Sequence, residues 1–149
     1  MTSPERDLEP IRLILEGGAD HAGWIYTQGQ RMTDILSAGE PFSFLSEDDM
    51  TQWTEVIPDD TLLVVPPPHV SLPTLRQPGT NHRALITAGD YHVTGMAHLR
   101  PGEQDDPMLH ATRRFLPLTE ATFVRGDGPE EQVDVLIVNL RRTSAFRVV

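Results

Sequence analysis

The sequence contains neither cysteine nor lysine, and both absences narrow what the chain can do. Without cysteine there is no disulfide framework and no thiolate metal site. Without lysine, all 12 basic residues are arginine, and 22 acidic residues oppose them for a net charge of −10. Negative charge of this size opposes binding to nucleic acid and to anionic membranes, because both need positive charge on the protein. We therefore expect neither nucleic acid nor membrane as a partner.

Long hydrophobic runs are also missing. The longest apolar stretches, Leu62–Val65 and Val135–Val138, have the length of strands and fall far short of the ~20 residues of a membrane-spanning helix. The first nine residues hold three acids and no apolar run, whereas a secretory signal needs a basic start and an apolar middle. These features predict a cytoplasmic protein.

Short apolar landmarks recur along the chain in one order, which predicts an internal duplication. Coincidence among short apolar runs is the alternative. On the duplication, Gly23 should superpose on Gly95 and Leu63 on Leu136. The landmarks lie 72 or 73 positions apart and are Leu13 with Leu85, Gly23 with Gly95, Ile35-Leu36 with Met108-Leu109, Phe42 with Phe115, and Thr61–Val65 with Asp134–Val138.

The landmarks divide the chain into a first β-rich repeat at 1–68, a proline-rich linker at 69–82 and a second β-rich repeat at 83–149. Proline withdraws backbone donors and favours extended chain, which is typical of a linker. Alternation of apolar and polar residues predicts strands in the second repeat, and the proline and acids of Asp106–Arg114 predict a short helix. The predicted strands are Ala84–Ala88, Tyr91–Leu99, Phe115–Val124, Val133–Leu140 and Ser144–Val149.

The expected fold is mainly β, with two tandem small β-barrel-like repeats of the SH3-like or Sm-like kind and short helical turns. In the first repeat the acidic stretch Ser46–Asp60 takes the place of a strand. Large apolar residues of the strands should form the core. They are Phe42, Phe44, Phe115, Leu116, Leu118, Leu136 and Val138.

The order of a strand, a hairpin into a glycine-bearing strand and a closing apolar strand resembles an Sm-like unit. RNA binding is not implied, because Gln104-Asp105-Asp106 and Asn139-Leu140-Arg141 do not match the loop residues with which Sm-like proteins bind RNA. The chain also resembles a group of small bacterial domains through Phe115-Leu116-Pro117-Leu118-Thr119 and Val138-Asn139. That resemblance implies no activity.

Candidate sites for chemistry are weak. A zinc site of His92, His98 and Asp105 or Asp106, approached by His110, is one interpretation, and water-exposed histidines on a strand are the preferred one. No serine lies in a nucleophile elbow, and the glycine pairs do not fit a phosphate-binding loop. We therefore assign no catalytic residue, no cofactor and no metal ligand.

Candidate partner contacts are stronger. Trp53 and Met50 stand in an acidic stretch, and such side chains are enriched at interface centres, although Trp53 could also cover the end of the core. We expect a non-catalytic binding or regulatory module that acts through protein contacts or self-association. The alternatives are a nucleic-acid-associated Sm-like protein, and a small-molecule or metal sensor or enzyme with a pocket between the repeats that uses His92, His98 or Arg113. The predicted partner contacts are Met50, Trp53, Arg113, Arg114, Arg141 and Arg142.

Overall fold

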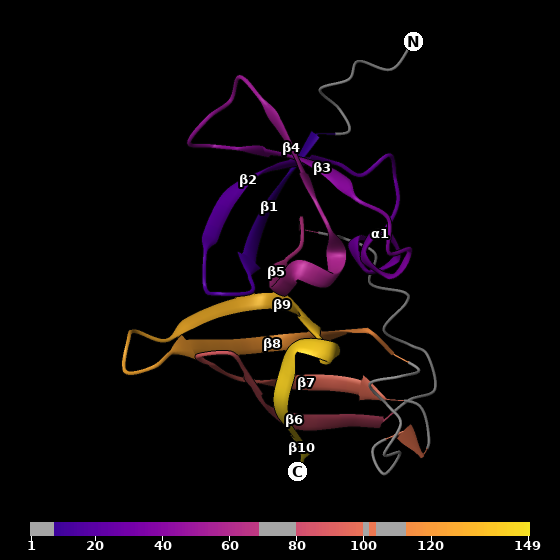
Figure 1. Cartoon of the computed structure of the whole chain (residues 1–149). Coiled ribbons are helices and arrows are strands. Elements are labelled where there is room, and N and C mark those ends of the chain that lie inside the picture. Colours follow the sequence, from indigo (N-terminus) through magenta and orange to yellow (C-terminus); the bar gives the residue numbers. More distant parts are fainter. Residues whose placement is uncertain (1–7, 69–79, 100–101, 104–112) are drawn as a thin grey trace.

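The computed structural model describes residues 8–68, 80–99, 102–103 and 113–149. Its ten strands are antiparallel and form one hydrogen-bonded sheet in the order β10-β6-β7-β8-β9-β5-β1-β2-β3-β4 (Figure 1). The strands are β1 (Leu8–Leu15), β2 (Asp20–Tyr26), β3 (Phe42–Ser46), β4 (Trp53–Val56), β5 (Thr61–Val65), β6 (Thr80–Ala88), β7 (Tyr91–Leu99), β8 (Phe115–Arg125), β9 (Glu131–Asn139) and β10 (Thr143–Val148).

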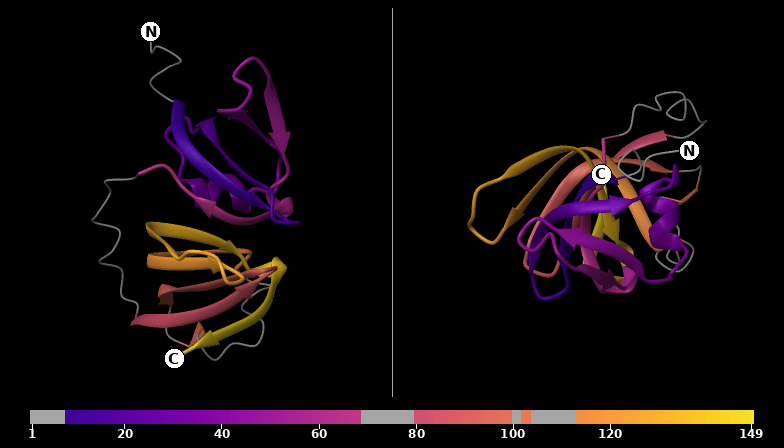
Figure 2. Two further views of the ribbon diagram at one scale, coloured as in Figure 1. Left: turned by 90° about the vertical axis from the view of Figure 1, so that its left-hand side faces the viewer. Right: turned by 90° about the horizontal axis from the view of Figure 1, so that it is seen from above.

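The expected mainly β fold is confirmed, but the expected small closed barrels are not what this sheet forms. In the described residues, β4 and β10 are the two ends of the sheet and do not pair with each other. The hydrogen bonding instead continues from one half of the chain into the other, because β5 pairs with β9. Figures 1 and 2 show the two halves stacked, with these two strands between them.

Each half of the chain arranges its five strands in the same way. The fifth strand lies beside the first, followed by the second, third and fourth, as β5-β1-β2-β3-β4 and as β10-β6-β7-β8-β9. Gly23 on β2 and Gly95 on β7 therefore lie on strands of the same rank, as predicted. The predicted equivalence of Leu63 and Leu136 is wrong, because Leu63 lies on a fifth strand and Leu136 on a fourth.

The strand β4 explains that error. The stretch Ser46–Asp60, expected to be an acidic loop, contains this strand. Three of the four residues of β4 are exposed, so the sequence carries no pattern of burial there. Without β4 in the count, the next apolar run, Thr61–Val65, is aligned with the fourth strand of the second half instead of its fifth.

Short 3-10 turns lead from the fourth strand to the fifth in both halves. These are η2 (Pro58–Asp60) and η5 (Leu140–Arg142). Thr61 donates its hydroxyl to the carbonyl oxygen of Pro58 at 2.6 Å, and Thr143 donates to that of Leu140 at 2.7 Å. Each hydroxyl satisfies a carbonyl of its turn and fixes the direction of the strand that follows.

The second strands need glycine because the third strand approaches them closely. A Cβ on Gly23 would lie 2.0 Å from the carbonyl oxygen of Leu45, and one on Gly95 would lie 2.9 Å from the Cβ of Leu118. The residues opposite the glycines are Ile11 on β1 and Ala84 on β6.

The core forms two clusters that each reach across the β5–β9 junction. One cluster consists of buried residues of the second half together with Ile14, Leu62 and Leu63 of the first. The other consists of buried residues of the first half together with Phe115 and Ile137 of the second. All seven residues predicted for the core are buried.

The remaining predictions concern helices and the linker. The helix α1 (Met32–Ser37) precedes β3, whereas the helix predicted at Asp106–Arg114 falls mainly outside the described residues. The strand β6 begins at Thr80, within the segment assigned to the linker; residues 69–79 are outside the described part. No helix in the described ranges is long and apolar enough to cross a membrane.

Candidate functional site

An exposed aromatic pair lies beside the edge of the sheet formed by β4. Trp53 on β4 is 42% exposed and Tyr26 on β2 is 39% exposed. Their rings stack with centroids 5.0 Å apart and planes at 24°. Met50 and Ile57, on either side of β4 in the sequence, are also exposed. We call Tyr26, Met50, Trp53 and Ile57 the β4 edge surface.

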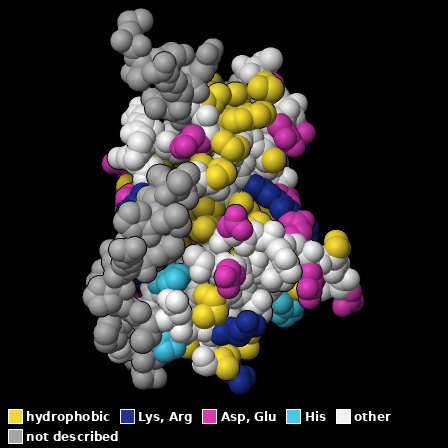
Figure 3. All heavy atoms as spheres, turned by 180° about the vertical axis from the view of Figure 1, so that it is seen from behind, with side chains coloured by type: hydrophobic (Ala, Val, Ile, Leu, Met, Phe, Trp, Pro, Cys, Tyr) yellow, Lys and Arg dark blue, Asp and Glu magenta, His cyan; other side chains and the backbone are white. Residues whose placement is uncertain are grey.

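Hydrophobic side chains gather at the end of the molecule formed by the first half (Figure 3). Most of the protein's large apolar side chains are buried, so this exposed group stands apart from the rest of the described surface. Such exposed apolar groups mark sites of interaction more often than scattered single residues do.

The loop before β4 is acidic and held in a defined shape. The carboxylate of Asp49 accepts hydrogen bonds from the backbone N–H of Thr51, at 3.1 Å, and from the Thr51 hydroxyl. These bonds hold the pKa of Asp49 below its usual range, because they stabilise the charged carboxylate. The backbone N–H of Asp48 donates to the hydroxyl of Ser46 at 3.2 Å. The loop thus presents fixed negative charge beside the β4 edge surface.

Two of the arginines predicted to contact a partner bind the first half of their own chain. Arg142 donates from Nε to the carbonyl oxygen of Asp59 at 2.9 Å and forms an ion pair with Glu16 at 3.0 Å. Arg114 reaches the carboxylate of Asp59 at 3.7 Å. These contacts hold η5 and the residue just before β8 against the turn η2, at the β5–β9 junction.

The other two predicted arginines differ from each other. Arg113 is partly buried and forms an ion pair with Glu103 at 3.5 Å. Arg141 is exposed, and its side chain has no ion pair with any residue in the described ranges. Of the four arginines, Arg141 is therefore the one whose charge is available to a partner.

Arg12 is a second link between the halves, and sequence reasoning missed it. Its guanidinium binds the carboxylate of Asp20 through two hydrogen bonds, of 2.9 and 2.6 Å, and also binds Glu131 on β9. This pairing raises the pKa of Arg12 and lowers that of Asp20, because each group stabilises the charged form of the other. Glu131 is distant in the sequence, so no local pattern could have indicated the contact.

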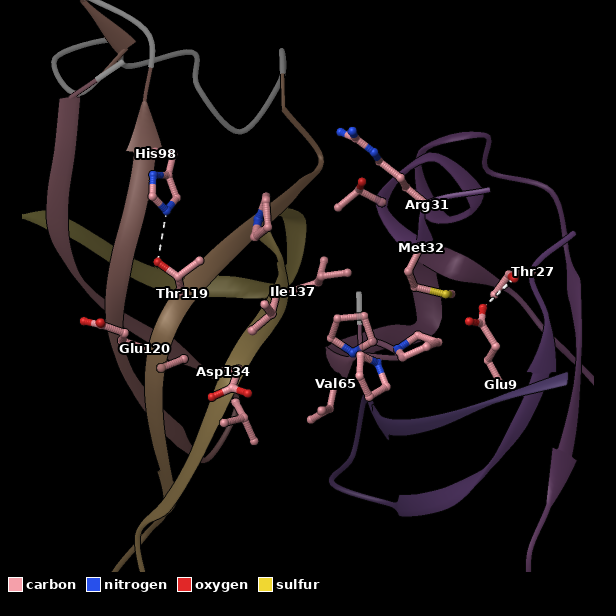
Figure 4. Close-up of a pocket in the computed structure, with 18 of the residues that line it drawn as sticks. Glu9, Thr27, Arg31, Met32, Val65, His98, Thr119, Glu120, Asp134 and Ile137 are labelled. Atoms are coloured by element: carbon pink, nitrogen blue, oxygen red, sulfur yellow. Dashed lines mark hydrogen bonds between the residues drawn. The ribbon is translucent and has the colours of Figure 1, made fainter. Parts of the chain in front are cut away.

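A cleft of about 1150 Å³ separates the first half from β8 and β9 (Figure 4). On one wall Glu9 accepts a hydrogen bond from the hydroxyl of Thr27 at 2.6 Å. On the other, His98 Nε2 lies 2.9 Å from the hydroxyl of Thr119. Arg31, at the start of α1, lines the cleft and is exposed. Among the residues proposed for a pocket between the repeats, His98 lines this cleft, whereas His92 and Arg113 do not.

The two histidines of β7 are too far apart to share a metal ion. His92 and His98 lie on one face of the strand, but six residues of extended chain separate them by ~20 Å. Within the described part of the chain, no group of three or more histidine or acidic side chains is placed to hold a metal. Asp105, Asp106 and His110 lie outside that part.

Comparisons of the chain with protein-family models, with curated proteins and with solved structures found no match. A functional assignment therefore depends on the residues themselves. The β4 edge surface and the cleft are two features of the described residues that a partner or ligand could occupy.

Proposed function

We propose that the protein is a non-catalytic binding or regulatory module that acts through protein contacts at the β4 edge surface. The observation that carries this proposal is the stacked pair of exposed rings, with Trp53 on the unpaired edge strand and Tyr26 two strands further in. Aromatic residues and methionine are enriched at the centres of protein interfaces, and charged residues form the rim. Here Met50 and the acids before β4 supply both elements.

The strand itself supports the same proposal. Within the described residues, β4 pairs with β3 and with no other strand, so one row of its backbone donors and acceptors is unpaired. An unpaired edge is a template for the addition of another strand, and main-chain hydrogen bonds give such a contact affinity. The stacked rings beside it would then supply apolar contact area.

We further propose that the two halves are diverged copies of one five-stranded unit. The shared strand order, the glycines at Gly23 and Gly95, and the hydroxyl bonds of Thr61 and Thr143 support this duplication. A duplicated unit to which we assign no site chemistry is more consistent with a binding scaffold than with an enzyme.

A photo-crosslinking amino acid at position 53 tests the proposed function. The full chain carrying benzoyl-phenylalanine in place of Trp53 is expressed in its own host cells, illuminated, and its adducts are identified by mass. We expect one defined adduct, because the proposal places this side chain within contact distance of a partner. The matched control carries the same group in place of Asp127, an exposed residue of the β8–β9 hairpin far from β4 in the sheet.

An adduct at position 53 that is absent at position 127 would support the proposal. Equal labelling at both positions, or no adduct at position 53 while the protein is folded, would overturn it. The mass of the adduct also distinguishes a different protein from a second copy of the chain.

A second candidate function is the binding of a small molecule in the cleft, which its volume of about 1150 Å³ favours. Clefts between structural units are common ligand sites. A metabolite screen by thermal melting would identify a ligand, and the matched variants His98→Ala and His92→Ala would locate it. Both histidines lie on the same face of β7, but only His98 lines the cleft. A shift in melting temperature that both variants retain equally would exclude binding beside His98.

A further inference from the structure

The junction between the halves joins a fifth strand to a fourth strand. In the described residues the sheet also ends in one strand of each kind, with one edge unpaired. β5 is the fifth strand of the first half and β9 the fourth of the second. In the described residues, β4 and β10 are the ends of the sheet and lie near opposite ends of the molecule (Figure 1). The unpaired edges of β4 and β10 therefore belong to a fourth and a fifth strand, like the edges of β9 and β5 that pair at the junction.

We propose that the β10 edge of one copy pairs with the β4 edge of a second copy, so that the β5–β9 junction is repeated between chains. This inference rests on the proposed function, since it names the partner of the β4 edge surface. The pairing of β5 with β9 can serve as a template for the pairing of β10 with β4, because β5 and β10 begin with the same register to their neighbouring first strands. Thr61 pairs with Leu15, and Thr143 with Ala88, and in each case the next residue of the fifth strand is skipped in the ladder.

The register between chains follows from the register inside the chain. Counting from Thr61 and Thr143 equates Leu63 with Ala145 on the fifth strands. On the third strands, pairing with the second strands next to Gly23 and Gly95 equates Leu45 with Thr119, and so Phe42 with Leu116, one residue from the predicted Phe115. Phe42 pairs with Val56 and Leu116 with Val138, so Val56 and Val138 are equivalent on the fourth strands. Inside the chain, Leu63 pairs with Val138 and Val64 with Ile137. The equivalent pairs between chains are Ala145 with Val56, Phe146 with Glu55, Arg147 with Thr54 and Val148 with Trp53.

The charges at the two edges are reversed in sign relative to the internal junction. Inside the chain, Asp59 on the side of β5 is contacted by Arg142 and Arg114 on the side of β9. Arg141 holds the position of Asp59 in the second half, since each lies two residues before the threonine of its turn. In the first half, Asp60 holds the position of Arg142, one residue before the threonine, and Glu40 holds that of Arg114, two residues before the equivalent Phe42 and Leu116.

The opposite charges therefore still meet when the junction is repeated between chains. Arg141 of one copy would face Asp60 and Glu40 of the next. Arg141 and Glu40 are both exposed, and neither forms an ion pair with a residue in the described ranges. Asp60 is also exposed and makes only a long contact with Arg142, at 3.9 Å. These side chains are free to meet a partner without breaking a close internal contact.

The same charges select against other pairings. Two β4 edges would bring Glu55 and the acidic loops together, which costs free energy through repulsion of like charges. A contact of β10 with β4 is head-to-tail, so each added copy leaves one edge of each kind until a ring closes. We therefore expect a ring or a growing chain of copies and no two-fold dimer.

Two single charge reversals and their mixture test this arrangement. The full-length variants Glu40→Arg and Arg141→Glu are each examined by sedimentation velocity over a range of concentrations, together with the unchanged protein. We expect the unchanged protein to associate increasingly as its concentration rises. Each variant should associate at least ~10-fold more weakly, because each places like charges across the contact. Mixing the two variants should restore association, because every contact between unlike variants again joins an arginine to a glutamate across positions 40 and 141.

The controls are Asp127→Arg and Arg31→Glu, which change charge equally at exposed positions away from both edges. They should associate like the unchanged protein, and thermal melting should show that all variants are folded. A protein that stays monomeric at every concentration would overturn the proposal, as would variants whose mixture associates no better than each alone. A monomer that still yields an adduct with another protein at position 53 would leave the proposed function standing, and only the self-association would fall.

Discussion

Asn139, the last residue of β9, donates its side-chain amide to the backbone carbonyl oxygen of Thr61 at 2.8 Å. Its own amide oxygen accepts from the backbone N–H of Arg141 at 3.1 Å. Asn139 is 1% exposed, so one buried side chain caps the turn η5 and binds the first residue of β5 in the other half. The junction is thus held by a polar group as well as by apolar packing.

We expect Asn139→Ala to lower the free energy of unfolding by ~1–3 kcal/mol, because it leaves buried backbone groups without hydrogen-bond partners. Urea denaturation followed by circular dichroism measures the change. The matched control is Asn81→Ala at an exposed position on β6, which should change the midpoint little. Equal midpoints for the two variants would show that the buried amide adds nothing to the stability of the junction.

Truncation of Phe115 should be more costly. Phe115 is 5% exposed and belongs to the cluster that contains the core of the first half. Phe115→Ala should lower the free energy of unfolding by ~3–5 kcal/mol, and Phe115→Leu, which keeps most of the volume, by less than ~1.5 kcal/mol. A Phe115→Ala protein that melts within a degree or two of the unchanged protein would contradict the assigned packing.

The two mid-strand glycines should tolerate alanine to different degrees. In Gly23→Ala the new Cβ meets the backbone carbonyl oxygen of Leu45, which cannot move without breaking the pairing of β2 with β3. In Gly95→Ala it meets side-chain and backbone atoms at 2.9 Å or more. We expect both variants to be destabilised, Gly95→Ala by ~1–3 kcal/mol and Gly23→Ala by more, as measured by urea denaturation. The reverse order would show that the approach of β3 to β2 is looser than described.

A structural feature can be predicted from the sequence where the local pattern of apolar and polar residues reflects which side chains are buried. The alternation of β7 predicts Tyr91–Leu99 with its final bounds, since a strand with one buried face has a regular pattern. The strand β4 escapes prediction because Trp53, Thr54 and Glu55 are all exposed at an edge, where no burial pattern arises.

The same distinction between local pattern and distant contact applies to the site residues. The acidic surroundings of Trp53 leave open whether it is partly exposed or covers the end of the core, and in the structure it is 42% exposed. The partners of Arg114 and Arg142 could not be predicted, because Asp59 and Glu16 meet them only through the pairing of β5 with β9. Contacts made by strands from different halves have no local signature.

Acid should weaken the link between Arg12 and Asp20. Arg12 lowers the pKa of Asp20 in the folded protein, so the pair contributes stability above the unfolded pKa, ~3.9, and loses it as the pH falls through the lower folded pKa. At neutral pH, Asp20→Asn should lower stability by under ~1 kcal/mol, since the pair is partly exposed. The difference from the unchanged protein should shrink as the pH falls below ~3.9 towards the lower folded pKa of Asp20.

Melting curves of both proteins between pH 7 and pH 3 measure this difference. Asp127→Asn, at an exposed position with no ion pair to a described residue, is the matched control and should show no such convergence. A stability difference for Asp20→Asn that is the same at pH 7 and pH 3 would mean that ionisation of Asp20 does not stabilise the fold.

Tryptophan fluorescence should distinguish the β4 edge surface from the core. Trp24→Phe leaves only Trp53, and Trp53→Phe leaves only Trp24, which is less exposed. Because Trp53 is 42% exposed, we expect the first variant to emit further to the red and to be quenched more strongly by acrylamide than the second. Tyr26→Ala, added to Trp24→Phe, removes the stacked ring and should increase the quenching again. Emission from Trp53 that is blue-shifted and resists acrylamide would place this side chain in the core, and neither the proposed contact surface nor the pairing of copies through β4 would then stand.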